Sequence, residues 1–86
     1  MTAADLLARL AQRPPKPRRP TALTTNEWSR YEGRVLKRAE FDRALLLDAV
    51  EAYLAECYKP GDLHNPQITE AEHALHTIVA TLRESP

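Results

Sequence analysis

Residues 41–58 have the sequence FDRALLLDAVEAYLAECY, which is the most apolar stretch of this 86-residue chain. On a helix, with 100° per residue, its apolar side chains cover almost the whole circumference. One wide stripe contains Leu46, Leu47, Val50, Tyr53, Leu54 and Cys57, and the opposite side contains Phe41, Leu45, Ala49 and Ala52. A helix that is apolar on both sides is normally the central helix of its domain or part of an oligomer interface. We therefore expect this stretch to be the central helix of an all-α domain.

A second helix is predicted just before this stretch, from about Thr25 to Arg38. Thr24 and Glu27 have the spacing of a capping box. The helical period separates an apolar side, expected to face inward, from a basic side, expected to face outward. These sides consist of Trp28, Tyr31, Val35, Leu36 and Ala39, and of Arg30, Arg34, Lys37 and Arg38. Because neither Pro nor Gly separates Lys37 from Phe41, the sequence is compatible with one continuous helix or with two.

The last predicted helix begins after a break at residues 59–62, Lys-Pro-Gly-Asp. Thr69 and Glu72 form a second capping-box pattern, so we expect this helix to start at Thr69 and to end near Glu84. Its expected inward face consists of Ala71, Leu75, Ile78, Val79 and Leu82. Together with residues 41–58 it should form an antiparallel hairpin against which the second helix packs.

The N-terminal part of the chain predicts a short helix on a stiff connector. Residues 2–13 begin with Thr2 and Asp5 in capping-box spacing, and three leucines fall on one side of the helix: Leu6, Leu7 and Leu10. Residues 14–20 read PPKPRRP, which favours an extended, polyproline-like chain. The expected organisation is an N-terminal arm (1–13), a Pro/Arg-rich linker (14–23) and a helical bundle (24–86). The predicted fold is thus a small three-helix bundle with an additional short N-terminal helix.

Charge is distributed unevenly along the chain, although the formal net charge is zero. Between Arg9 and Arg43 ten basic residues outnumber four acidic ones, whereas between Ala44 and Pro86 seven acidic residues outnumber two basic ones. A local positive excess of this kind is typical of a surface that contacts an anion. The candidate anion-binding residues are Lys16, Arg18, Arg19, Arg30, Arg34, Lys37 and Arg38. The alternative is a solvated helix face whose charges pair with Glu27 and Glu32 or with the acidic half of another copy of the chain.

The residue pattern gives little support to metal binding or catalysis. Cys57, His64, His73 and His76 match no standard zinc-ligand spacing, and no nucleophile, base or phosphate-binding glycine motif is present. We therefore expect no metal, no cofactor and no enzymatic activity. Stacking of Trp28, Tyr31 and Tyr53 on nucleic-acid bases is an alternative to the core positions that we expect for them.

Two hypotheses of function follow. The first is a non-enzymatic regulatory or accessory protein that contacts the phosphates of DNA or RNA through the basic residues. The second is a protein–protein adaptor or inhibitor that inserts Leu6, Leu7 and Leu10 into a groove of a larger, possibly host, partner with an acidic surface. In both cases we expect a cytoplasmic homodimer, because the chain has one cysteine, no membrane-length apolar run and a small core.

Overall fold

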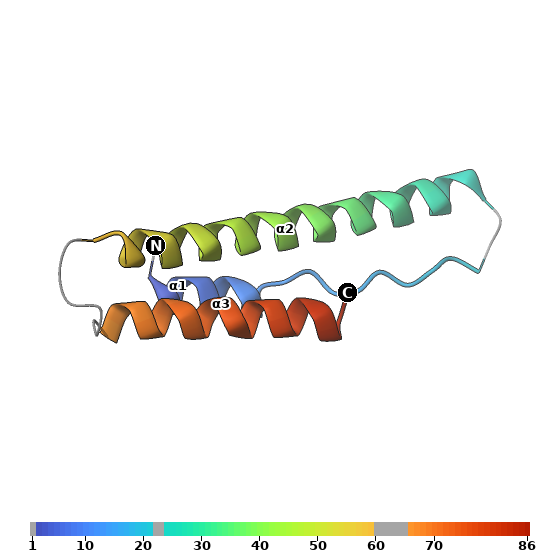
Figure 1. Ribbon diagram of the computed structural model, residues 1–86. Helices are drawn as coiled ribbons and strands as arrows, with labels where there is room; N and C mark the ends of the chain where they lie inside the picture. Colours follow the sequence, from blue (N-terminus) through green and yellow to red (C-terminus); the bar gives the residue numbers. More distant parts are fainter. Residues whose placement is uncertain (1, 22–23, 60–65) are drawn as a thin grey trace.

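Three helices make up the fold, as Figure 1 shows for the computed structural model, which describes residues 2–21, 24–59 and 66–86. They are α1 (Ala3–Ala11), α2 (Thr25–Cys57) and α3 (Pro66–Glu84). No strand occurs in these ranges, so the prediction of a small all-α bundle is confirmed. In none of these helices does an apolar stretch reach the length that crossing a lipid bilayer requires.

The second and third predicted helices are a single one, because α2 runs without interruption for 33 residues. At 1.5 Å per residue such a helix is about 50 Å long. α3, with 19 residues, and α1, with nine, are much shorter. The molecule is consequently elongated, measuring 59 × 17 × 17 Å between Cα atoms, with a radius of gyration of 16.7 Å. A compact chain of this length would have a radius of gyration of about 12 Å.

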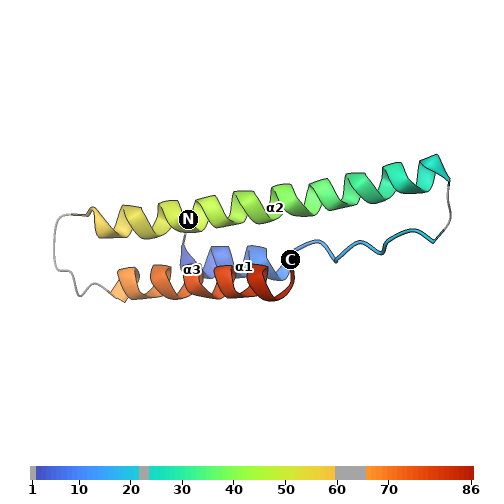
Figure 2. The same cartoon turned by 45° about the vertical axis from the view of Figure 1, so that its right-hand side comes forward.

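α1 and α3 pack side by side against the C-terminal half of α2 and run antiparallel to it (Figures 1 and 2). The N-terminal half of α2 projects beyond both of them. In the two views the extended connector, residues 13–21, continues from the end of α1 beside this projecting half, away from the bundle. The C-terminus lies near the middle of α2, where α3 ends and the connector begins.

The core lies where the three helices meet. Leu6 of α1, Leu45 and Ala49 of α2 and Ile78 of α3 are fully buried and contact one another. Partly buried side chains surround them: Leu10, Phe41, Leu46, Ala52, Leu75 and Leu82. A helix as short as α1 is marginal in water, and burial of Leu6 explains why it forms here. α1 is thus the third member of the bundle.

Two of the three predicted helix starts are correct, since α1 follows Thr2 and α2 begins at Thr25, but only the first has the predicted capping box. Thr2 and Asp5 make both hydrogen bonds of a capping box, each 3.2 Å long. Hydrogen bonds from Thr2 to the Asp5 carboxylate, above all the one from its main-chain N–H, lower the pKa of Asp5. Their contribution to stability is therefore present above the normal carboxyl pKa and is lost as the pH falls through the lowered value. The Thr24 side chain makes no capping hydrogen bond. α3 begins at Pro66 rather than at Thr69, since Pro is well suited to the first turn of a helix.

The expected inward side of the N-terminal half of α2 is wrong. Val35 is 41% exposed and Leu36 is 62% exposed, whereas Arg38, which was expected to face solvent, is only 8% exposed. Trp28 and Tyr31 are half-buried. The reason is that α3 ends beside the middle of α2, so that no other helix of the described residues covers the stripe beyond that point.

Replacing Leu6 with alanine tests whether α1 is part of the core. Because Leu6 is fully buried, we expect Leu6→Ala to lower the free energy of unfolding by about 2–5 kcal/mol. Leu36→Ala removes the same atoms at an exposed site and should change it by less than about 0.5 kcal/mol. Urea denaturation followed by far-ultraviolet circular dichroism measures both. Equal small effects would show that α1 does not contribute to the core.

Candidate anion-binding site

Two ion pairs fix the end of α1 and the start of the connector to α2. The Arg13 guanidinium donates from Nε to Asp42 Oδ1 and from Nη2 to Asp42 Oδ2, both at 2.8 Å. The Arg13 side chain is 9% exposed and that of Asp42 is 21% exposed, so water screens this bidentate pair only weakly. One helical turn earlier in α1, Arg9 pairs with Asp48. These contacts determine where the connector leaves the bundle.

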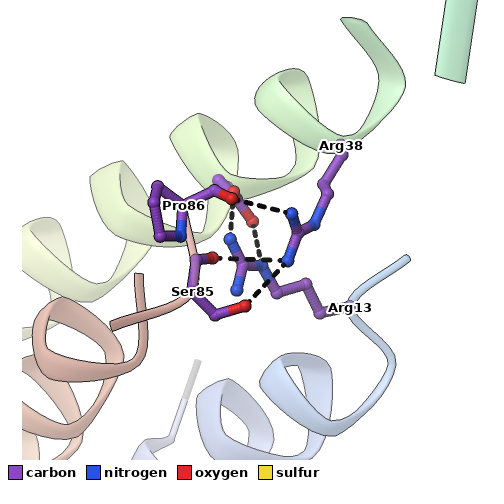
Figure 3. Close-up of polar contacts among 5 residues, drawn as sticks. Arg13, Arg38, Ser85 and Pro86 are labelled. Atoms are coloured by element: carbon purple, nitrogen blue, oxygen red, sulfur yellow. Dashed lines mark hydrogen bonds and ion pairs between the residues drawn. The ribbon is translucent and has the colours of Figure 1, made fainter. Parts of the chain in front are cut away.

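Arg38 belongs to the same region and does not face solvent as expected. Its Nη1 donates to the main-chain oxygen of Pro86 at 3.0 Å, and its Nη2 donates to the main-chain oxygen and to Oγ of Ser85, both at 3.3 Å (Figure 3). Main-chain oxygens after the end of a helix need donors, and a buried guanidinium supplies them. Arg38 therefore holds residues that follow α3 against α2, and we remove it from the candidate anion-binding set.

The remaining arginines of the candidate set come together beyond this point. Arg18 and Arg19 of the connector and Arg30 and Arg34 of α2 line one open hollow of about 420 Å³, which we call the basic hollow. Its other walls are Pro20, Thr21, Glu27 and Tyr31. All four arginines are exposed. Within the described residues none of the four has a salt bridge to a carboxylate, so Glu27 and Glu32 do not neutralise them as the alternative reading required.

Aromatic rings lie beneath the connector at the basic hollow. The Arg19 guanidinium carbon is 5.7 Å from the centroid of the Trp28 ring, which is within cation–π distance. Trp28 and Tyr31 in turn contact each other edge to face, with centroids 5.7 Å apart and an interplanar angle of 87°. The Arg19–Trp28 contact helps to place Arg19 next to α2. The rings are therefore neither fully buried core residues nor an open stacking platform.

Two basic candidates lie outside this arrangement. Lys16 lines a neighbouring, smaller hollow with Tyr31 and Arg38, and its side chain is exposed. Lys37 is exposed on α2 but is not among the residues that line the basic hollow. Four of the seven predicted anion-binding residues thus line the basic hollow. Lys16 and Lys37 lie outside it, and Arg38 binds the residues that follow α3.

The three leucines of the adaptor hypothesis lie on α1, which packs against α2 and α3. Leu6 is fully buried in the core, Leu10 packs against that core and Leu7 is half-buried. A partner could bind Leu6 through a groove only after α1 had left the bundle, whereas Leu7 and Leu10 remain partly exposed.

The residues considered for metal binding do not converge in the described ranges. No three His, Cys, Asp or Glu side chains there are placed to hold a metal ion. His76 is exposed and lies 3.8 Å from Glu72, and His73 is also exposed. Cys57 is half-buried near Tyr53, whose pKa it raises. His64 lies outside the described residues.

Comparison of the sequence with protein-family models and with curated proteins, and of the fold with solved structures, finds no match. The function must therefore be inferred from the geometry of the chain.

A double-mutant cycle on Arg13 and Asp42 measures how strongly the connector is held. Because the pair is bidentate and mostly shielded, we expect a coupling energy of about 1–2 kcal/mol from Arg13→Ala, Asp42→Ala and the double variant. The Lys59–Glu56 pair is more exposed and lies at the end of one helix, so the matching cycle should give less than about 0.5 kcal/mol. Urea denaturation provides the values. Equal coupling in the two cycles would contradict a role for Arg13 in docking the connector.

Proposed function

We propose that this protein is a non-enzymatic accessory or regulatory protein that binds DNA or RNA through phosphate contacts in the basic hollow. The observation that carries the proposal is the convergence of Arg18, Arg19, Arg30 and Arg34, from two separate segments, on one hollow whose described walls include a single acidic residue, Glu27. Four guanidinium groups that have no salt bridge among the described residues produce a concentrated positive potential. Phosphate is an anion whose geometry guanidinium matches well.

The spacing of the arginines favours an extended polyanion over a single small ion. Arg30 and Arg34 are one turn apart, about 6 Å along α2, so their side chains follow the helix axis. Arg18 and Arg19 lie on an extended chain next to them. Two parallel rows of positive charge suit a nucleic-acid backbone that passes between the connector and α2.

The connector supports the proposal because its shape is largely set before any ligand binds. Pro14, Pro15, Pro17 and Pro20 fix φ at four of its positions, while the Arg13–Asp42 pair and the Arg19–Trp28 contact hold it near α2. Binding groups that are already positioned lose less conformational entropy when the ligand arrives. Four arginines dominate the hollow and supply positive charge and hydrogen-bond donors, and we therefore propose binding without catalysis. The setting that we propose is the cytoplasm, where the free thiol of Cys57 stays reduced.

A salt series tests the proposal directly. Fluorescence anisotropy of labelled duplex DNA, single-stranded DNA and single-stranded RNA should show affinity falling steeply with salt. If the four arginines contact about four phosphates, the slope of log K against log salt for the duplex is about −3 to −4. Binding that is absent, or that does not depend on salt, would contradict the proposal and would favour the acidic protein surface of the adaptor hypothesis.

Charge removal locates the contact. Arg34→Gln should weaken binding to all sequences alike and reduce the magnitude of the slope by about one, and Arg30→Gln with Arg34→Gln by about two. Folding should be unaffected, since neither side chain has a salt bridge among the described residues. Lys59→Gln is the matched control, because it removes one positive charge at the opposite end of α2. If Lys59→Gln and Arg34→Gln reduce the slope equally, the contact is not in the basic hollow.

A further inference from the structure

A second groove runs between α2 and α3, and its described walls include no residue of α1. They are Leu46 and Val50 of α2 and Leu75, His76, Val79, Ala80 and Arg83 of α3, around a volume of about 490 Å³. α1 occupies the other side of the helix pair, where Leu6 and Leu10 reach the core. We call this second groove the outer groove.

The outer groove continues onto an exposed apolar ridge of α2. Leu47 is 52% exposed and Leu54 is 42% exposed. With 100° per residue, both lie within about 60° of Val50 on the helix circumference. The ridge and the groove therefore form one continuous apolar surface. A chain of this size buries only about 60% of its unfolded surface on folding, and contiguous exposed apolar surface is typical of an interaction site.

The charged residues at the two ends of this surface have opposite signs. Arg83 lines the end of the groove near the C-terminus of α3, and on α2 Arg43 lies within about 20° of Val50 on the same side. Both arginines are exposed, and neither has a salt bridge among the described residues. Glu72 lies three turns before Arg83, about 16 Å away, on the same face of α3. One end is thus basic and the other is acidic.

We propose that a second copy of this chain occupies the outer groove, with the two copies related by a two-fold axis and their helices antiparallel. A two-fold axis across the middle of the groove reverses its direction, so the basic end of each copy meets the acidic end of the other. The Leu47–Leu54 ridge of one copy then packs into the outer groove of its partner. This arrangement uses the apolar surface and the end charges together, and it is independent of nucleic-acid binding.

Measured mass tests the presence of the dimer. Sedimentation velocity over a concentration series should show the 9.7 kDa chain converting to twice that mass. Leu47→Glu places a charge in the centre of the interface and should raise the dissociation constant at least about tenfold. It should leave the helical signal unchanged, because Leu47 is half exposed.

Ala8→Glu is the control for the Leu47 variant, because Ala8 is exposed on α1, which lies on the other side of the helix pair and lines no described wall of the outer groove. This variant adds the same charge away from the outer groove, so the dissociation constant should stay within about twofold of the wild-type value. A wild-type mass of 9.7 kDa at all concentrations, or equal effects of the two variants, would overturn the proposal.

A charge exchange tests the two-fold arrangement. Arg83→Glu and Glu72→Arg each put like charges together twice in the dimer, so each variant alone should dissociate about tenfold more readily. An equimolar mixture of the two variants should associate as the wild type does, because each contact then joins a glutamate of one copy to an arginine of the other. A mixture that stays monomeric would show that these positions do not meet across a two-fold axis.

Discussion

The length of α2 is the constraint from which the other features of the molecule follow. α2 has 33 residues, whereas α3 has 19 and α1 has nine, so helix packing can cover only part of it. The C-terminal half obtains a conventional core around Leu45 and Ala49. Of the described residues, only the extended connector lies beside the N-terminal half, and a chain of prolines and arginines buries little apolar surface. The side chains there stay partly exposed, and polar contacts provide the cohesion that a core provides elsewhere.

The transition between the two halves lies at one group of ionic contacts. Arg13 forms an ion pair with Asp42 there, and Arg38 donates hydrogen bonds to the residues after α3. Arg38 and Asp42 are one helical turn apart on α2. The two arginines close the open end of the bundle: one fixes the segment that leaves α1, and the other satisfies main-chain oxygens beyond α3. Positive charge in this chain thus has two uses. Near the bundle it is paired and structural, and in the basic hollow it has no carboxylate partner among the described residues.

Local patterns predicted the helices well and their environments less well. Capping-box spacing located the start of α1, and apolar periodicity located most of α2 and α3, because both signals act within a few residues. The burial of Arg38 depends on where α3 ends, and the Arg13–Asp42 pair joins residues 29 positions apart. The helical period of a segment cannot predict contacts between residues so far apart in the sequence. The same limit explains the error at Val35 and Leu36: their stripe is amphipathic, but no described helix covers it beyond the end of α3.

The two proposals are connected by the position of the basic hollow at the projecting end of α2. The outer groove lies on the C-terminal half of α2, so a partner bound there leaves the basic hollow open. An antiparallel dimer would carry its two basic hollows at opposite ends. One long nucleic acid could then be contacted twice, which raises the effective affinity without any new contact, provided that the ligand spans the distance between them. The length of α2 sets that distance, so the feature that left half of the helix without a core would also set the minimum length of ligand that benefits from both sites.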